Sequence, residues 1–362
     1  MGDVVKRALA VLALALAGGC RLIAGIDHVE LGDGGMSPEG GDGCAGSCTP
    51  TQVFTRGNEP IVRILSDGQY VYALLSASIV RCRVTGCGTT PDTVVPTVAA
   101  GIIGDFALDA RLYYSIEGNT LTLPDGGAPP ANDGVIHAVD KNGMNDQAFL
   151  PALPAPRFMA IAGDLYWFDD QDGIGADNPI NSLRRCPLTG GCGKGVSVID
   201  GLGGLGTSVA ADSKSVYVLT GTKAATSDGV FACGTGQTCG MMPRIALTAI
   251  DNIGQNSIAT DGTNLFLANN TKGDIVRVDQ QNIAKTLAGG QSAPAGIATD
   301  GKYVYWGTVT GSIMRIGVDG GNAQTVATSQ AKPSSLIIDA VNVYFVVESG
   351  QGSTVMALPK PP

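Results

Sequence analysis

Residues 294–329 read PAGIATDGKYVYWGTVTGSIMRIGVDGGNAQTVATS. Four segments of this stretch are rich in Val, Ile, Tyr, Thr or Ala, and most of these residues favour strands: 296–299, 303–308, 312–317 and 323–327. An Asp-Gly pair follows the first segment at Asp300 and the third at Asp319. Asp-Gly is favoured in hairpin turns because both central residues need a positive φ. The stretch therefore predicts one antiparallel unit of four strands, named a to d in chain order.

An Asp followed five residues later by an aromatic side chain recurs along the chain. The six pairs are Asp67 and Tyr72, Asp109 and Tyr114, Asp212 and Tyr217, Asp261 and Phe266, Asp300 and Tyr305, and Asp339 and Tyr344. A seventh copy at 161–167 is one residue short, with its Asp164 displaced. The copies recur about every 40–50 residues, a period typical of propeller blades made of short strands. The sequence therefore predicts an all-β propeller.

The two ends of the repeat region predict how the ring closes. The last copy holds strands at 335–339, 343–347 and 354–358, and no fourth strand follows them. Residues 51–56 stand directly before the first copy, in the same position that the strand at 324–328 has before the last copy. We expect 51–56 to pair with 354–358 as the outer strand of the last blade, because this pairing removes exposed sheet edges. Seven four-stranded blades result, and six or eight are the alternatives.

One blade resembles a known repeat. Tyr303-Val304-Tyr305-Trp306, Gly311–Arg315 and Asp319–Asn322 are similar to the Tyr-Trp-Thr-Asp repeats of low-density-lipoprotein-receptor propellers, although Gly307-Thr308 stands in place of Thr-Asp. That family usually has six blades. The whole chain is similar to bacterial envelope lipoproteins with degenerate propeller repeats. These resemblances imply a fold and a location, and a function has to come from a site.

The N-terminus reads as a targeting segment. Lys6 and Arg7 precede an apolar run at 8–17, which is too short to cross a bilayer and suits a signal peptide. Residues 16–20, Leu-Ala-Gly-Gly-Cys, resemble the bacterial lipobox, with Ala17 where a branched aliphatic residue is usual. We expect residues 1–19 to be cleaved and Cys20 to carry the lipid that anchors the chain, with Arg21 favouring the outer membrane. The alternative is cleavage after Ala17, which would give a soluble secreted or periplasmic protein.

The cysteine count agrees with lipid on Cys20. The chain has nine cysteines, and the remaining eight form four close pairs: Cys44 and Cys48, Cys82 and Cys87, Cys186 and Cys192, and Cys233 and Cys239. Such pairs in an exported chain predict disulfides formed in an oxidising compartment. The alternative is zinc, but no pair has Cys-x-x-Cys spacing and the chain has two histidines.

Residues 20–50 are expected to be a flexible tether between the anchor and the propeller of residues 51–362. The stretch 31–48 is dense in Gly and Asp and has few apolar residues, so it cannot bury enough surface to order itself. The net charge of −9 argues against a nucleic-acid partner, which would need a basic face.

The connections between strands b and c are longer in the second, third and fourth blades than in the others. They span Glu117–Gly134, Asp169–Asn181 and Thr220–Asp228. These connections leave the propeller on one face. Long loops on a rigid scaffold often carry binding residues, so we expect this face to bind a protein or glycan partner. The alternative is surface loops without a ligand.

The most acidic of these loops is a candidate calcium site. It carries Asp169, Asp170, Asp172 and Asp177 among Gly and Asn, and calcium prefers oxygen ligands of this kind. The spacing does not match an EF-hand, because Phe168 stands where the first Asp should be. The alternative is a solvated acidic loop, and no other cofactor is expected.

No catalytic constellation is evident. A Ser-His-Asp set in the propeller would have to use His137, because His28 lies in the tether, and no nucleophile-elbow sequence accompanies it. The sequence therefore favours a non-catalytic recognition or scaffold propeller displayed on the envelope. The alternative is an envelope enzyme of lyase, glycosidase or quinoprotein type.

Overall fold

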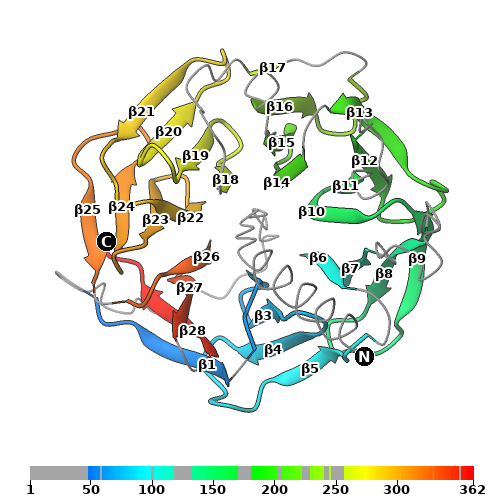
Figure 1. Ribbon diagram of the computed structural model, residues 1–362, viewed down its shortest axis with the longest axis horizontal. Helices are drawn as coiled ribbons and strands as arrows, with labels where there is room; N and C mark the ends of the chain where they lie inside the picture. The colour runs from blue at the N-terminus through cyan, green and yellow to red at the C-terminus, as the bar shows by residue number, and fades with distance from the viewer. Residues whose placement is uncertain are drawn as a thin grey trace, which may run out of the picture.

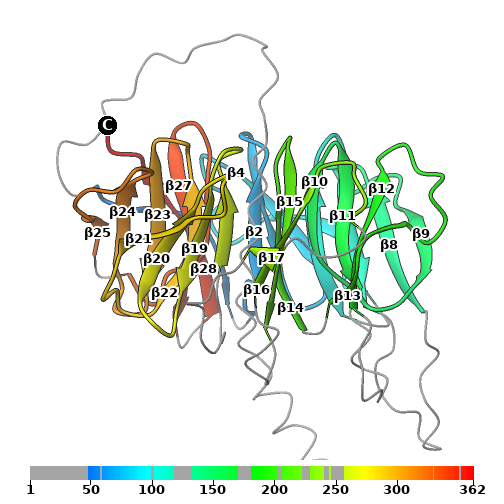
Figure 2. The same ribbon diagram turned by 90° about the horizontal axis from the view of Figure 1, so that it is seen from above.

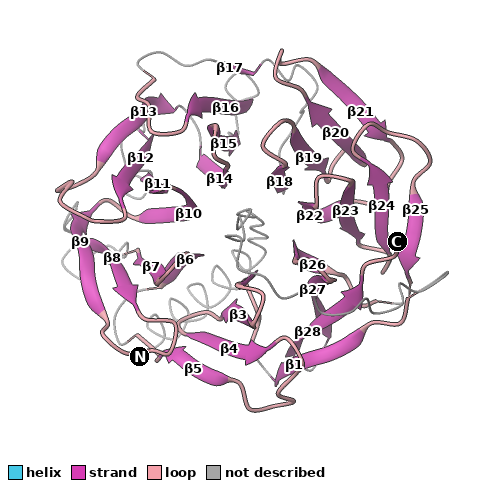
Figure 3. Cartoon of the chain, turned by 180° about the vertical axis from the view of Figure 1, so that it is seen from behind, coloured by secondary structure: helices cyan, strands magenta, loops and turns pink. Residues whose placement is uncertain are grey.

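The computed structural model describes residues 48–57, 59–98, 102–117, 133–169, 181–202, 205–221, 229–239, 244–245, 257–328, 330–349 and 352–362. The regular structure of these residues is all β-strand, in seven four-stranded antiparallel sheets set around a central axis (Figures 1 and 3). This confirms the seven-bladed all-β propeller. None of the described residues forms a helix that is apolar and long enough for a bilayer. The predicted signal peptide, Cys20 and the tether up to residue 47 lie outside the described residues.

Each blade has its strands in chain order from the axis outward, except where the ring closes. Blade 1 holds β2 Arg63–Ser66, β3 Tyr70–Leu74, β4 Ile79–Arg83 and β5 Asp92–Val95; blade 2 holds β6 Ile103–Leu108, β7 Leu112–Ile116, β8 Gly134–Val139 and β9 Gln147–Leu153. Blade 3 holds β10 Pro156–Ala162, β11 Asp164–Asp169, β12 Asn181–Pro187 and β13 Val196–Leu202; blade 4 holds β14 Leu205–Ala211, β15 Ser215–Gly221, β16 Gly229–Gly234 and β17 Arg244–Ile245. Blade 5 holds β18 Ser257–Thr260, β19 Leu265–Asn269, β20 Asp274–Val278 and β21 Ala284–Ala288; blade 6 holds β22 Pro294–Thr299, β23 Tyr303–Thr308, β24 Ile313–Gly317 and β25 Gln324–Ala327. Blade 7 holds β26 Ser334–Ile338, β27 Asn342–Ser349, β28 Gly352–Pro359 and, as its outer strand, β1 Thr51–Gly57.

The predicted closure is confirmed. β1 pairs antiparallel with β28, with Thr55 opposite Thr354 (Figure 1). β1 also bonds to blade 1, because Val53 O accepts from Cys87 N and Gly88 O accepts from Thr55 N, both at 3.0 Å. The first strand therefore ties the last blade to the first.

Antiparallel order gives the propeller two faces. The b–c connections and the links between blades leave one face, which we call the loop face. The a–b and c–d turns leave the other, which we call the turn face. Figure 2 shows the disc edge-on, with the strands running between the two faces.

The recurring Asp shapes the a–b turn. Its Oδ1 accepts hydrogen bonds from backbone N–H groups two and three residues later, for instance from Gln69 and Tyr70 to Asp67. Asp212, Asp261, Asp300 and Asp339 do the same. Such side-chain caps are a known reason for Asp in turns. The repeated phrase is therefore structural.

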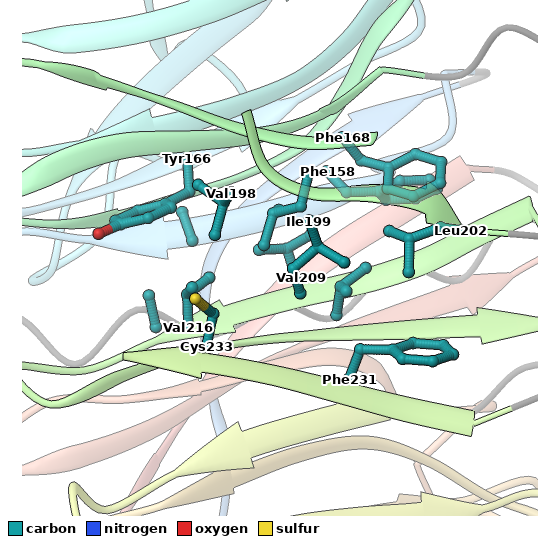
Figure 4. Packing of buried hydrophobic residues seen from close by; sticks show 14 residues of the cluster. Phe158, Tyr166, Phe168, Val198, Ile199, Leu202, Val209, Val216, Phe231 and Cys233 are labelled. Atoms are coloured by element: carbon teal, nitrogen blue, oxygen red, sulfur yellow. The ribbon is translucent and has the colours of Figure 1, made fainter. Parts of the chain in front are cut away.

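Apolar side chains fill the space between neighbouring blades. Between blades 3 and 4, Phe158, Phe168, Val209 and Phe231 belong to one buried cluster that draws on both sheets (Figure 4). The β-branched and aromatic residues of the repeat face such clusters, so each sheet buries both of its faces. This rigid ring holds the connections on either face in fixed positions.

Three predicted disulfides are present at the ends of β4, β12 and β16: Cys82–Cys87, Cys186–Cys192 and Cys233–Cys239. Each lies against the outer strand of the preceding blade. Cys239 N, for example, donates to Val198 O of β13 at 2.8 Å. Each disulfide therefore closes a turn within its own blade, and that turn contacts the preceding blade. Cys48 is also disulfide-bonded, whereas Cys44 lies outside the described residues, so that pair stays a prediction.

Candidate functional site

The b–c connections differ in length around the ring. Those of blades 2, 3 and 4 span 117–133, 170–180 and 222–228, whereas the other four span 75–78, 270–273, 309–312 and 350–351. The predicted position of the extra length, between strands b and c of three adjacent blades, is confirmed. Most of these three connections lies outside the described residues, but the strands that carry them are described.

The base of the blade 2 connection is braced against blade 3. Glu117 follows β7, and its Oε2 accepts from Arg157 Nη2 of β10 at 2.5 Å, with both side chains largely buried. Gly104 makes this possible, because a Cβ there would lie 2.8 Å from Glu117 Cγ and 2.9 Å from Pro156 O. The ion pair therefore fixes the start of the longest connection to the next inner strand.

A second, fully buried ion pair joins the inner strands of blades 1, 2 and 3. Arg63 Nη1 bonds to the Asp105 carboxylate, and both side chains are 1% exposed. Arg63 Nη1 also donates to Phe106 O at 3.1 Å and to Met159 O at 3.2 Å. Asp105 Oδ2 accepts from Met159 N at 2.7 Å. Buried charges need such partners, so this pair holds three blades in one arrangement around the axis.

The base of the blade 3 connection holds a carboxyl with an altered acidity. Asp169 ends β11 and is fully buried; its Oδ1 accepts from Trp167 Nε1 at 2.8 Å, and its Oδ2 forms an ion pair with Arg184. Burial raises the pKa of Asp169 to about 7, although the Arg184 charge and the Trp167 hydrogen bond oppose the rise. Asp169 can therefore gain or lose a proton near neutral pH.

The four proposed calcium ligands are not brought together by the described structure. Asp169 is engaged by Trp167 and Arg184 at the end of β11. Asp170, Asp172 and Asp177 lie outside the described residues. Among the residues that the structure places, no group of three or more His, Cys, Asp or Glu side chains could hold a metal. The calcium site therefore stays a prediction.

Replacing Asp169 with asparagine is expected to flatten the pH dependence of stability. The folded protein keeps the Asp169 proton up to a pH of about 7, whereas the ordinary pKa is 3.8. As the pH rises through this range, the unfolded chain loses its proton first, so this residue lowers the free energy of unfolding by about 2–4 kcal/mol. Urea denaturation at about pH 4 and about pH 8 should show this fall in the wild type and not in Asp169→Asn. An equal fall in both proteins would contradict the assignment.

His137 lies on strand c of blade 2, as the sequence indicated. Its Nδ1 is 3.0 Å from Asp146 Oδ1, and its ring stacks on Tyr114 with centroids 5.0 Å apart. The Tyr114 hydroxyl donates to Asp146 Oδ2 at 2.8 Å. These contacts hold the strands of one blade together, and strand c is the third strand from the axis. His137 therefore has a structural explanation.

The ion pairs around Arg63, Glu117 and Asp169 were not expected from the sequence. A signal was present, since Arg63 and Asp105 are single charges inside strands that are otherwise mostly apolar. What the sequence does not give is which charge on one blade meets which charge on another.

Comparisons with known proteins support the fold. No protein-family model matches the chain, and no curated protein gives a significant match. Virginiamycin B lyase from Staphylococcus aureus is similar in structure at 13% identity, with a TM-score of 0.60, over 87% of this chain and 99% of that one. A catalytically inactive variant of that lyase with quinupristin gives 12% identity and a TM-score of 0.58 over the same shares. YCF48 bound to D1 peptide gives 12% identity and 0.59, over 86% of this chain and 95% of that one. At these identities the likeness shows the propeller fold alone.

Proposed function

We propose that the chain is a non-catalytic recognition propeller, held on the bacterial outer membrane by lipid on Cys20, that binds a macromolecular partner through the loop face of blades 2–4. The observation that carries this proposal is the extra length of three adjacent b–c connections on one face. Neighbouring long connections can form one continuous surface, and loops on a rigid scaffold are a common place for binding.

The scaffold beneath these connections supports the proposal. Glu117 and Arg157 brace the start of the first connection, and Asp169 and Arg184 link the two strands that carry the second. Partners of this kind keep a binding site in a fixed geometry. YCF48, a structural neighbour bound to D1 peptide, also agrees with a binding role for this fold.

Site-specific photo-crosslinking tests the binding face. A benzophenone amino acid is placed in the connection 118–132, and the matched control carries it at Val341, which is 57% exposed on the turn face. We expect discrete crosslinked products in envelope preparations from the loop position and none from Val341. A glycan array probed with the wild type and with a variant shortened at 118–132 tests a glycan partner. Equal products from both faces, with no glycan binding that depends on the loop, would contradict the proposal.

Metabolic labelling with a lipid precursor tests the anchor. Wild-type chain should take up the label and fractionate with the outer membrane, whereas Cys20→Ala should lose both properties. Cys82→Ala with Cys87→Ala is the matched control, because it removes two cysteines and leaves the anchor. Unchanged labelling and fractionation of Cys20→Ala would remove Cys20 as the anchor, and a wild-type chain that takes up no label would favour a soluble exported protein.

An envelope enzyme of lyase, glycosidase or quinoprotein type is the second candidate, because virginiamycin B lyase has a similar fold. Asp169, a buried carboxyl at the base of the blade 3 connection, is the group whose part in proton transfer is tested. Quinupristin is a practical probe, because it is present in the structure of a catalytically inactive lyase that has the same fold. A change of its mass that Asp169→Asn abolishes would favour the enzyme, and an unchanged mass would count against a lyase of this kind.

A further inference from the structure

Arginines occupy a repeated position on the turn face. Strand c places Arg81, Arg185, Arg277 and Arg315 directly opposite the recurring aromatic residue of strand b. Three of these guanidinium groups reach the residues that follow strand c of the next blade. Arg81 Nη1 donates to Lys141 O at 2.7 Å, Arg277 Nη1 to Val318 O at 3.2 Å, and Arg315 Nη1 to Pro361 O at 2.9 Å. The space between these blades is therefore built to hold a guanidinium group.

In two of these positions an aromatic ring also lies against the guanidinium group. The Arg81 guanidinium carbon lies 4.4 Å from the centre of the Tyr70 ring, and that of Arg315 lies 4.3 Å from the centre of the Tyr303 ring. A cation over an aromatic face is attracted by the ring's negative face. Each ring is two residues before the recurring aromatic of its blade. We call the whole arrangement, with its carbonyl acceptor in the next blade, the guanidinium slot.

The corresponding position in blade 4 has neither the arginine nor the aromatic ring. Ala232 lies opposite Tyr217, and Ser215 takes the place of Tyr70 and Tyr303. The last blade also has an alanine here, Ala357, but the Cys82–Cys87 disulfide packs beside it. No disulfide is described in the c–d turn of blade 5. Among the described residues, the boundary between blades 4 and 5 therefore has neither an arginine side chain nor a disulfide to fill it.

A cavity of about 190 Å³ occupies this boundary. Tyr217 and Ala232 line it from blade 4, and Val278, Gln280 and Asn282 line it from blade 5. Tyr217 is partly exposed, whereas the other six recurring aromatics are at most 2% exposed. A water molecule needs only about 10–15 Å³ of such volume, so the cavity can admit a planar group of several heavy atoms.

One carbonyl acceptor of a filled slot has a counterpart in the lining of the cavity. By strand register, Gln280 takes the place of Val318, whose carbonyl accepts from Arg277. The carboxylate-bearing Asp279 also lines the cavity. Lys214 lines it too, but Lys302 has the corresponding turn position in blade 6, where Arg315 still fills its slot. A lysine at this turn is therefore compatible with a guanidinium in the slot.

We propose that this cavity is a guanidinium-binding site, which takes an arginine side chain of a partner polypeptide or a free guanidinium compound. The net charge of −9 favours approach of a cation. The site lies on the turn face, so it is separate from the loop face and stands whether or not the loop face binds a partner.

A titration followed at the tyrosine rings tests the proposal. The full chain is labelled on its nine tyrosines, and the Tyr217 resonance is identified by its loss in Tyr217→Phe. Argininamide should shift that resonance with a dissociation constant of about millimolar order. Lysinamide should shift it much less, because an ammonium lacks the planar fork of a guanidinium.

Three variants make the test specific. Ala232→Arg fills the slot from within and should weaken argininamide binding at least ~10-fold. Ala232→Leu fills part of it without charge and serves if the arginine variant does not fold. Arg315→Ala empties a filled slot beside Tyr303, so argininamide should shift the Tyr303 resonance only in that variant. This last variant shows that the method detects an occupied slot.

The outcomes separate the possible sources of the ligand. Binding of an arginine-containing peptide at least ~10-fold tighter than argininamide identifies a polypeptide partner, and equal affinities identify a small guanidinium compound. The proposal is overturned if argininamide leaves the Tyr217 resonance of the wild type unchanged. It is also overturned if lysinamide binds equally well, or if Ala232→Arg or Ala232→Leu binds as the wild type does.

Discussion

Replacing Arg63 with alanine is expected to lower the free energy of unfolding by about 3–5 kcal/mol. The substitution leaves the Asp105 carboxylate 1% exposed and without its cation, and it removes the hydrogen bonds to Phe106 O and Met159 O. An unpaired buried charge costs far more than an exposed one. Urea denaturation at neutral pH measures the change.

Two further variants separate the cost of the unpaired charge from general damage. Arg63→Met combined with Asp105→Asn removes both charges and keeps an acceptor for Met159 N, so it should recover at least half of the loss. Arg56→Ala breaks the exposed ion pair with Glu59, whose side chain is 45% exposed, and should change stability by less than about 1 kcal/mol. If Arg63→Ala cost no more than Arg56→Ala, the buried pair would not hold the inner strands.

Replacing Phe54 with alanine is expected to destabilise the closure of the ring. Phe54 is fully buried in β1, and a cavity of this kind costs about 3–5 kcal/mol. Loosening β1 also exposes the edge of β28, and exposed edges pair with other chains. We expect a lower denaturation midpoint together with oligomers or aggregates in size-exclusion chromatography.

Thr51→Ala is the control for this prediction. Thr51 lies at the exposed start of the same strand, so the variant should stay monomeric with a change of less than about 0.5 kcal/mol. A Phe54→Ala protein with the wild-type midpoint and elution volume would mean that the ring stays closed without β1.

The blades were predictable because their signals are local and repeated. An Asp that caps a turn and an aromatic residue five positions later mark the first hairpin of most blades, from Asp67 and Tyr72 to Asp339 and Tyr344. The outer strand of the last blade was predictable because residues 51–56 resemble the outer strand of another blade. The positions of three disulfides followed from cysteines placed alike at the ends of strand c.

The site was less predictable because it depends on contacts between blades. Asp105 meets Arg63 from one neighbouring blade and Met159 N from the other, and no spacing in the sequence encodes these contacts. Asp169 reads as part of an acidic loop, yet it ends a strand and is buried beside Trp167. The empty slot at Ala232 becomes visible only when strand register aligns it with Arg81 and Arg315.

The position of β1 also has a mechanical consequence. Chain that precedes β1 joins the disc at Cys48, whose N–H bonds to Val326 O of blade 6 at 3.3 Å. The next residues pair with β28 of blade 7 and bond to Gly88 beside blade 1. A tensile load on the chain before β1 would therefore reach three adjacent sheets.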